Sequence, residues 1–288
     1  MTAPMGALAP RSLLFVPALQ ATSLLAKVPR WRPDVVVVDL EDAVPPDRKE
    51  EAREVLVEAV RSTPVAPTLT FVRLNAQASR WHERDVDAAV RSGASGVVLP
   101  KYDAVEQYDA LRQRLDAAGA ASLVIIVGLE TVLGVADARA LLARGPYAAY
   151  FGAEDYVSDL GGSRSDANLE VLYARSQVAV AGRLAGCPVI DQAVVSVRDQ
   201  DRFQREATEG RRLGYCGKIC IHPGQVALAH AAFSSSSVEI ARAEAVLAAA
   251  ADGVAIVEGD MVDEVHRRMA RQVLKLARHA GHEGEDQS

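Results

Sequence analysis

The sequence has few cysteines, few aromatic residues and no excess of positive charge. Its three cysteines, Cys187, Cys216 and Cys220, are an odd number in a chain of 288 residues, which argues against a disulfide framework. No neighbouring Cys/His pair completes a zinc site, so we expect small apolar core residues in a protein of the reducing cytoplasm. The net charge of −6 argues against a nucleic-acid-binding surface.

Long apolar runs and a dinucleotide-binding fingerprint are also missing. No apolar stretch approaches the roughly 20 residues that span a bilayer, so we expect no association with a membrane. No Gly-x-Gly-x-x-Gly follows the first apolar segment, which argues against a Rossmann fold. The fold class must therefore follow from the order of the shorter apolar segments.

Short apolar segments alternate with helical patterns along most of the chain. Eight segments are typical of buried strands: 12–17, 35–38, 68–74, 96–100, 123–127, 148–151, 188–194 and 218–221. Helical patterns lie at about 22–29, 48–61, 81–92, 105–118, 135–143, 168–185 and 200–213. This α/β alternation favours a closed TIM (β/α)8 barrel over an open doubly wound sheet, and we assign residues 1–232 to it.

Residues 233–288 form a second, smaller segment. A serine-rich break at 233–237 precedes an alanine-rich helical pattern to about 251, a turn or short hairpin at 255–262 and an amphipathic helix at 266–280. The polar tail beyond is expected to be disordered. The segment is too small to bury its own apolar faces, so we expect it to pack on the barrel or on a neighbouring subunit.

Ionisable side chains follow several of the predicted strands, at the end that is the catalytic face of a TIM barrel. They are Asp39, Glu41, Asp42, Arg73, Lys101, Glu130 and Asp155. Glu130 and Asp155, on adjacent strands, can converge on one Mg²⁺, and the planar fork of Arg73 can hold a carboxylate. Such a site can bind a 2-oxo or 2-hydroxy acid and stabilise an enolate.

These residues also have structural interpretations. A single acidic residue after a strand is often a helix cap, which we expect of Asp47 and consider for Glu130 with Thr131. His222 is expected to be a hydrogen-bonded structural histidine rather than a general base. Lys101 is expected to form a salt bridge or bind an anion, because nothing nearby predicts the desolvated pocket of a Schiff-base lysine. Ionisable groups on at least four strand ends nevertheless favour a functional site.

Seven motifs occur in an order that resembles a known family. They are RSLLFVP at 11–17, DLEDAV at 39–44, FVRLN at 71–75, VLPK at 98–101, GLET at 128–131, GAED at 152–155 and GKICIHP at 217–223. Together they resemble the citrate lyase β-subunit and malyl-CoA lyase group of the HpcH/HpaI aldolase superfamily, over nearly the whole chain. The resemblance implies a barrel with a C-terminal lid, trimers or hexamers, and Mg²⁺-dependent carbon–carbon cleavage or condensation of 3-hydroxyacyl-CoA thioesters.

The resemblance implies roles for the barrel residues. Glu130 and Asp155 would bind Mg²⁺, and Arg73 would bind the 2-oxo or dicarboxylate end of the substrate. Glu41 and Asp42 would act through water on the metal. Arg11 and Lys27 would lie along the path of CoA and offer positive charge to its phosphates.

The resemblance extends into the C-terminal segment. GDMVD at 259–263 resembles a lid motif whose aspartate, here Asp263, enters the neighbouring subunit's site and exchanges a proton with the acetyl-CoA enolate. The sequence departs from the family pattern here, where Glu264 and Val265 replace a residue followed by proline. It departs again after Asp191, which is not followed by the common threonine. Both departures concern the identity of the substrate.

We therefore expect a Mg²⁺-dependent lyase that acts on a short 3-hydroxyacyl-CoA, such as citramalyl-CoA or malyl-CoA, and releases acetyl-CoA with a 2-oxo acid or ketone body. One alternative is a metal-dependent aldolase of free 2-oxo-4-hydroxy acids. Two others are a citrate lyase β-like subunit and a non-catalytic ligand-binding barrel. Cleavage or synthesis of CoA esters by the purified protein would separate them.

Overall fold

The computed structural model describes residues 9–249 and 253–285, with side chains described as far as residue 277. The chain divides into two compact units, Met1–His230 and Ala231–Ser288. The first unit contains the barrel, and the second contains the helices and hairpin of the C-terminal segment. The division falls inside one helix, α11 (Gly224–Phe233).

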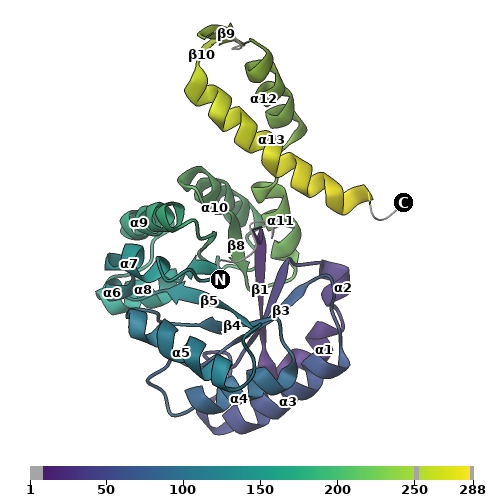
Figure 1. The fold of residues 1–288 in the computed structure, drawn as a ribbon, viewed down its shortest axis with the longest axis vertical. Coiled ribbons are helices and arrows are strands. Elements are labelled where there is room, and N and C mark those ends of the chain that lie inside the picture. The colour runs from purple at the N-terminus through teal and green to yellow at the C-terminus, as the bar shows by residue number, and fades with distance from the viewer. Residues whose placement is uncertain (1–8, 250–252, 286–288) are drawn as a thin grey trace. The chain divides into compact units, whose positions relative to one another are not determined.

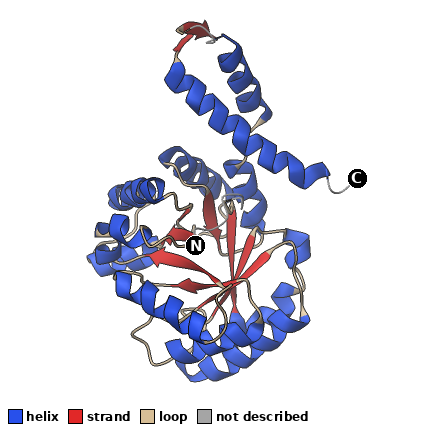
Figure 2. Ribbon diagram, in the orientation of Figure 1, coloured by secondary structure: helices blue, strands red, loops and turns tan. Residues whose placement is uncertain are grey.

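Eight parallel strands close into a barrel in which each strand pairs with its neighbours in sequence and β1 pairs with β8 (Figures 1 and 2). The strands are β1 Ser12–Pro17, β2 Val35–Asp39, β3 Leu69–Arg73, β4 Gly96–Leu99, β5 Val124–Leu129, β6 Ala148–Phe151, β7 Val189–Asp191 and β8 Gly217–Cys220. The predicted TIM barrel is confirmed. All strands run in one direction, so their carboxyl ends lie on one face.

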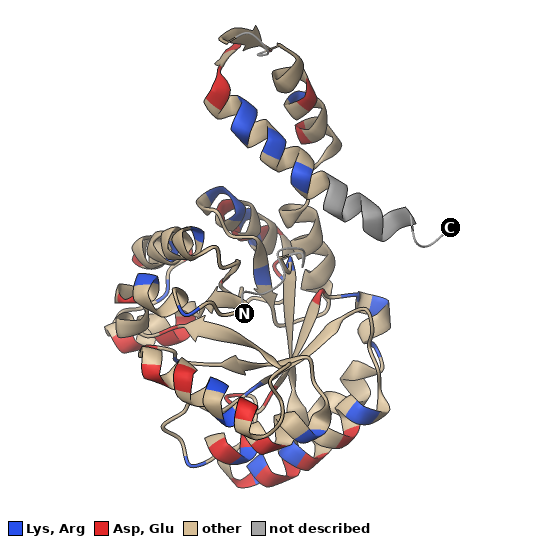
Figure 3. Cartoon of the chain, in the orientation of Figure 1, with Lys and Arg blue, Asp and Glu red and all other residues tan. Residues whose placement is uncertain are grey.

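Helices surround the barrel and carry most of the charged residues, while the strands carry few (Figures 2 and 3). They are α1 Ala21–Leu25, α2 Val28–Trp31, α3 Lys49–Ser62, α4 His82–Ser92, α5 Val105–Ala117, α6 Val132–Ala136, α7 Ala138–Leu142, α8 Ala153–Leu160, α9 Leu169–Ala185, α10 Gln200–Leu213 and α11, with short 3₁₀ turns η1 Ala18–Gln20 and η2 Pro46–Arg48. This distribution leaves the strands to form an apolar core.

Every second residue of a strand fills the barrel interior. The interior cluster consists of Leu13, Val35, Val37, Phe71, Val98, Ile126, Ala148, Tyr150, Ile190 and Ile219. Side chains on a strand alternate between its two faces, so Asp39 continues the inward row of Val37, and Arg73 continues that of Phe71. The pattern thus brings two charged residues into the mouth of the barrel.

The helices differ from the prediction at two places. The pattern at 22–29 is two helices, and Pro29 lies in the first turn of the second, where proline is favoured. Asp47 does not cap a helix, because it lies within η2. Thr131 does cap α6, accepting a hydrogen bond from the Gly134 amide at 2.9 Å.

Helix α8 lies in a segment where no helix is predicted from the sequence. It begins directly after β6, with Gly152 before its first residue, and ends at Gly161 with φ of 75°. Its eight residues are too few to show a clear helical period beside a strand end. The consequence is functional, because Asp155 belongs to the first turn of α8 rather than to a loop.

The second unit has its own small core. Helix α12 (Ser237–Ala249) and α13 (Glu264–Glu285) flank an antiparallel hairpin of β9 (Ala255–Val257) and β10 (Asp260–Val262). The predicted hairpin is therefore confirmed. The final helix continues beyond the predicted end at residue 280, and of the tail expected to be disordered, residues 286–288 lie outside the described part.

The cysteines are free, as predicted, and burial raises the pKa of each thiol to about 12. Within residues 9–249 and 253–285, no helix is both long and apolar enough to cross a membrane.

Candidate active site

The charged residues at the carboxyl ends of β2 and β3 face each other inside the barrel mouth. Asp39 and Arg73 are direct partners in the strand register. Arg73 donates through Nε to Asp39 Oδ1 and through Nη2 to Asp39 Oδ2, both at 2.7 Å. Its guanidinium lies 5.1 Å from the ring of Phe15. One edge of the planar fork is thus held by the protein itself.

The loop after β2 adds two more carboxylates around Arg73. Glu41 Oε2 is 3.2 Å from Arg73 Nη1, and Asp42 Oδ2 is 3.6 Å from Arg73 Nη2. Glu41 is buried, and this burial raises the pKa of its carboxyl to about 7 against the opposing effect of Arg73. Asp42 is exposed. The carboxylates of Asp39, Glu41 and Asp42 thus lie around one guanidinium group.

Lys101 links the β2 loop to the next strand ends. Its Nζ is 2.9 Å from Glu41 Oε1 and 3.5 Å from Asp155 Oδ1. Its backbone adopts a φ of 49°, a left-handed conformation that is uncommon for a residue with a side chain. That conformation accompanies a 2.7 Å hydrogen bond from the Lys101 amide to Glu130 Oε1. The salt-bridged Lys101 expected from the sequence is therefore present.

Glu130 follows β5 and is the most enclosed carboxylate of the site. Its Oε1 accepts hydrogen bonds from the Lys101 amide and, at 3.2 Å, from the Tyr150 hydroxyl. Burial, followed by the neighbouring Asp155 charge, raises the pKa of Glu130. Gly152 lies so close that a Cβ there would stand 2.4 Å from Glu130 Oε2. The glycine therefore leaves the space that this carboxylate occupies.

Asp155 faces the same space from the first turn of α8, where the helix dipole favours negative charge. Among the described side chains that meet here, the carboxylates outnumber the cations: Asp39, Glu41, Asp42, Glu130 and Asp155 stand against Arg73 and Lys101. Hard carboxylate oxygens with an excess of negative charge suit a divalent cation such as Mg²⁺. Within the described residues, no three of these side chains are arranged so that they could hold one ion together. Mg²⁺ is usually bound through one or two carboxylates and keeps several waters, so water and substrate would complete its coordination.

A buried lysine outside the mouth holds the β2 loop in place. Lys49 donates to the carbonyls of Leu40 (2.6 Å) and Glu41 (2.7 Å) and to Asn75 Oδ1 (2.7 Å). Asn75 is in turn bonded to Asp85 at 2.6 Å. All three donors of the ammonium group are used on neutral oxygens, which fixes the loop that carries Glu41.

The structure corrects the predicted role of Arg11. It precedes β1 and pairs with Asp34, through Nε at 3.1 Å and Nη2 at 3.0 Å, at the amino ends of the strands. His230 Nε2 lies 3.3 Å from the same carboxylate. Arg11 is therefore on the face opposite to the carboxylate cluster and does not belong to this site. Lys27, between α1 and α2, is exposed, and its predicted contact with CoA stays a prediction.

Asp263 belongs to the second unit, where it precedes α13. Its Oδ1 accepts hydrogen bonds from the amides of Val265 (2.9 Å) and His266 (3.3 Å). Hydrogen bonding from the His266 side chain and from these amides lowers the pKa of the carboxyl. Asp263 is thus a helix cap in this unit, and the proton-transfer role predicted for it is not tested by this geometry.

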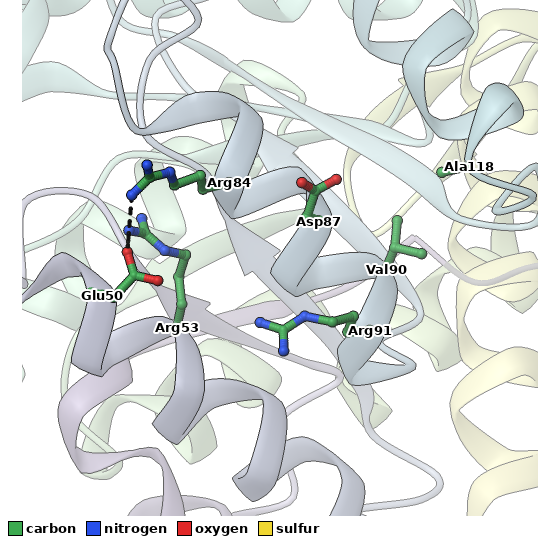
Figure 4. A pocket seen from close by; sticks show the side chains of 7 residues that line it. All are labelled: Glu50, Arg53, Arg84, Asp87, Val90, Arg91 and Ala118. Carbon is green, nitrogen blue, oxygen red and sulfur yellow. Dashed lines mark hydrogen bonds and ion pairs between the residues drawn. The ribbon is translucent and has the colours of Figure 1, made fainter.

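A surface pocket of about 480 Å³ lies away from the strand ends, on the outer helices α3 and α4 (Figure 4). Its lining includes Arg53, Arg84 and Arg91, which are paired with acidic residues: Arg53 and Arg84 with Glu50, and Arg91 with Glu54. These ion pairs leave the pocket without the uncompensated positive charge that an anionic ligand needs.

Comparisons with known proteins identify the family of this chain. Residues 11–223 match the family model described as HpcH/HpaI aldolase/citrate lyase, and residues 165–282 match that of a C-C bond lyase of the TIM-barrel fold. The chain belongs to the HpcH/HpaI aldolase/citrate lyase family. The first match covers all of the strand-end residues and ends before Asp263.

Three relatives of this family illustrate its range. A citrate lyase subunit beta-like protein of Deinococcus radiodurans is 46% identical over 92% of this chain and 96% of its own. The human mitochondrial citramalyl-CoA lyase is 30% identical over 93% of this chain and 85% of its own. The CitE protein of Mycobacterium tuberculosis, solved with magnesium, acetoacetate and coenzyme A, is 32% identical with a TM-score of 0.81, covering 94% of this chain and 98% of its own.

The sequence predicts the charged residues at the strand ends but not their neutral and buried partners. Tyr150 lies in a predicted strand, and its alternation with Ala148 places it on the inward face. Lys49 lies in a predicted charged helix, whose pattern does not indicate a contact with the loop after β2. The pairing of Asp39 with Arg73 was also missed, because it joins residues 34 positions apart.

Proposed function

We propose that the protein cleaves a short 3-hydroxyacyl-CoA, such as citramalyl-CoA or malyl-CoA, in a Mg²⁺-dependent reaction that releases acetyl-CoA and a 2-oxo acid. The observation that carries this proposal is that Arg73, at the end of β3, and Asp155, in the first turn of α8, both lie close enough to Glu130 to shift the pKa of its carboxyl. Two relatives are named as acting on such thioesters, the citramalyl-CoA lyase and a (3S)-malyl-CoA thioesterase of Cereibacter sphaeroides.

The reaction needs three events at the substrate. The hydroxyl on C3 loses its proton, the C2–C3 bond breaks to leave the carbonyl of the 2-oxo acid, and the enolate of acetyl-CoA takes up a proton. Mg²⁺ would supply positive charge for the oxygens on which negative charge develops. Glu130 and Asp155 would hold it, and Glu41 and Asp42 would orient water around it.

Arg73 would orient the carboxylate end of the substrate. Since Asp39 holds its Nε and Nη2 atoms, the side that carries Nη1 is the one to face a ligand, in competition with Glu41. The ion pair with Asp39 and the contact with Phe15 keep the guanidinium in one orientation. Arg73 would therefore bind the substrate carboxylate as a pre-oriented cation, without offering all of its donor atoms.

Asp263 of a neighbouring copy would exchange the proton of the acetyl-CoA enol or enolate. Its Oδ2 accepts no hydrogen bond among the described residues, while Oδ1 is used for capping, so one oxygen remains for chemistry. This role requires an oligomer, and we propose a homotrimer or hexamer with exchange of the lid. Lys27 would contact the CoA phosphates.

A second candidate is the citryl-cleaving subunit of a citrate lyase. It is favoured by the relatives named citrate lyase subunit beta, which are 30% identical in Haemophilus influenzae and 32% identical in Escherichia coli. The two candidates share the carbon–carbon cleavage and differ in the carrier of the acyl group. Cleavage of free CoA esters by this chain alone would favour the 3-hydroxyacyl-CoA lyase over the citrate lyase subunit.

The test is cleavage of citramalyl-CoA, malyl-CoA and 3-hydroxy-3-methylglutaryl-CoA by the purified protein with Mg²⁺, followed by mass spectrometry. We expect acetyl-CoA from one of them, and none from Glu130→Gln or after removal of the metal. A wild-type protein that cleaves none of the panel, and forms none from acetyl-CoA with glyoxylate or pyruvate, would contradict the proposal. Cleavage of free 2-oxo-4-hydroxy acids instead would identify an aldolase.

A further inference from the structure

Tyr150 is a buried phenol whose hydroxyl points at the carboxylate of Glu130. Its side chain is 2% exposed, and its hydroxyl donates to Glu130 Oε1 at 3.2 Å. The Lys101 amide donates to the same oxygen at 2.7 Å. The other oxygen, Oε2, accepts no hydrogen bond within the described part of the chain. The two oxygens of one carboxylate are therefore in different states.

The surroundings hold Tyr150 in this position. Its ring packs edge-on against Phe15, with the ring centroids 6.1 Å apart. On the other side, Gly128 lies so close that a Cβ would stand 2.4 Å from the Tyr150 hydroxyl oxygen. Gly128, which has no Cβ, therefore leaves the space that the Tyr150 hydroxyl occupies. A tyrosine hydroxyl carries its proton at neutral pH, so it can donate this hydrogen bond.

The number of free oxygens on a carboxylate affects which cation it prefers. Mg²⁺ demands near-octahedral geometry and takes carboxylates through one oxygen, whereas Ca²⁺ accepts more ligands and often binds both oxygens of one carboxylate. A carboxylate with one oxygen occupied by hydrogen bonds suits the first mode and opposes the second. Partners of this kind, beyond the ligands themselves, commonly tune metal affinity.

We propose that Tyr150 is a positioning residue that restricts Glu130 to one-oxygen binding and so sets the preference of the site for Mg²⁺ over Ca²⁺. The inference rests on the metal site of the proposed function, in which Glu130 is a ligand. It goes beyond that function because it assigns the choice of cation to a residue that does not touch the cation.

The chain offers a matched control for the loss of this hydroxyl. Tyr102 is also fully buried, and its hydroxyl donates at 3.2 Å to the carbonyl of Leu141, on α7. Tyr150→Phe and Tyr102→Phe each remove one buried hydrogen bond of the same length and keep the ring. A similar decrease in the melting temperature of both variants would show that they are folded and equally perturbed.

The experiment is calorimetric titration of Mg²⁺ and of Ca²⁺ into the full-length wild type, Tyr150→Phe, Tyr102→Phe and Glu130→Gln. We expect Tyr150→Phe to weaken Mg²⁺ binding about tenfold. We expect the ratio of the Ca²⁺ to the Mg²⁺ dissociation constant to fall by about fivefold, because Oε1 is partly released. Tyr102→Phe should leave both constants as in the wild type, and Glu130→Gln should lose Mg²⁺ binding.

Three results would overturn the inference, and they are distinguishable. If Tyr150→Phe binds both cations as the wild type does while Glu130→Gln does not, Tyr150 has no such role and the metal site stands. If Tyr150→Phe weakens the binding of both cations by the same factor, Tyr150 supports Glu130 without selecting the cation. If Glu130→Gln binds Mg²⁺ as tightly as the wild type does, or if the wild type binds no Mg²⁺, Glu130 is not a metal ligand. The metal site of the proposed function then fails together with the inference.

Discussion

Carboxylates of similar type have different tasks in this chain because their surroundings differ. Glu130 is enclosed and hydrogen-bonded through one oxygen, whereas Asp39 is committed to Arg73 through both. Asp263 caps a helix, where backbone amides stabilise its charge. Burial without a full set of partners raises the pKa of a carboxyl, and hydrogen bonds to its charged form lower it. Residue type alone therefore does not assign the role.

The pKa of Asp34 is lowered by its surroundings, whereas that of Glu41 is raised. Burial alone would raise its pKa, but hydrogen bonds from His230 and Arg11 outweigh this effect and lower the pKa well below the ordinary value of 3.8. A carboxyl whose pKa is lower in the folded than in the unfolded state stabilises the protein above the unfolded value. This contribution is lost as the pH falls below about 4.

We therefore expect Asp34→Asn to reduce the free energy of unfolding by about 2 kcal/mol at pH 7, allowing for the partial exposure of the pair. The difference from the wild type should be present between pH 5 and 8 and should narrow below pH 4. Urea denaturation at several pH values measures it. Glu54→Gln, which breaks the exposed pair with Arg91, is the control and should show no comparable loss. A difference that disappears between pH 5 and 8 would contradict this assignment.

At the scale of elements, the site depends on close contacts between neighbouring strands. Glu130 at the end of β5 fits against Gly152 at the end of β6, and Lys49 on α3 fixes the loop after β2. These contacts position the carboxylates before any ligand arrives, which is the condition for strong electrostatic stabilisation of a reacting group. The short helix α8, which follows β6, adds the carboxylate of Asp155 to the site.

Gly152→Ala should displace the Glu130 carboxylate, because the new Cβ would stand 2.4 Å from Oε2 and 2.6 Å from Glu130 Cβ. We expect Mg²⁺ binding to weaken at least about tenfold in a calorimetric titration. Gly162→Ala is the matched control, since its Cβ would meet nothing closer than 3.5 Å. Equal Mg²⁺ affinity in both variants would show that the site tolerates the shift and that the close approach is not required.

At the scale of the whole molecule, the two units carry different parts of the proposed site. The barrel unit contains the carboxylate cluster, and the C-terminal unit contains Asp263. Closed cyclic symmetry would let each copy supply Asp263 to a neighbour and receive one in return. The proposal therefore makes activity depend on contacts between copies.

Mixed oligomers test this dependence. Asp263→Asn keeps a good helix cap, so its melting temperature should match the wild type while its rate falls by about 10²–10⁴-fold. Co-expression of Asp263→Asn with Glu130→Gln, each inactive alone, should restore activity at about a quarter of the sites. Each variant co-expressed with itself is the control. Mixed oligomers without recovered activity would contradict proton transfer between copies.

Much of the fold could be predicted from the sequence because burial is encoded locally. The four valines before Asp39 and the short apolar runs of the other strands indicate a sheet buried on both faces, and the number of these segments indicates a barrel. The same pattern places Arg73, Glu130 and Asp155 at the carboxyl ends of strands, on one face. Helix α8 escaped prediction because eight residues give too little periodicity.

The pairing of polar atoms was decided only by the tertiary structure. Arg11 and Arg73 both lie in family motifs, but Arg11 precedes its strand and meets Asp34, while Arg73 ends its strand and meets Asp39. The two oxygens of Glu130 are identical in the sequence and become different only when Lys101 and Tyr150 bond one of them. A local pattern specifies which side chains are buried, whereas their partners depend on the register of strands distant in the chain.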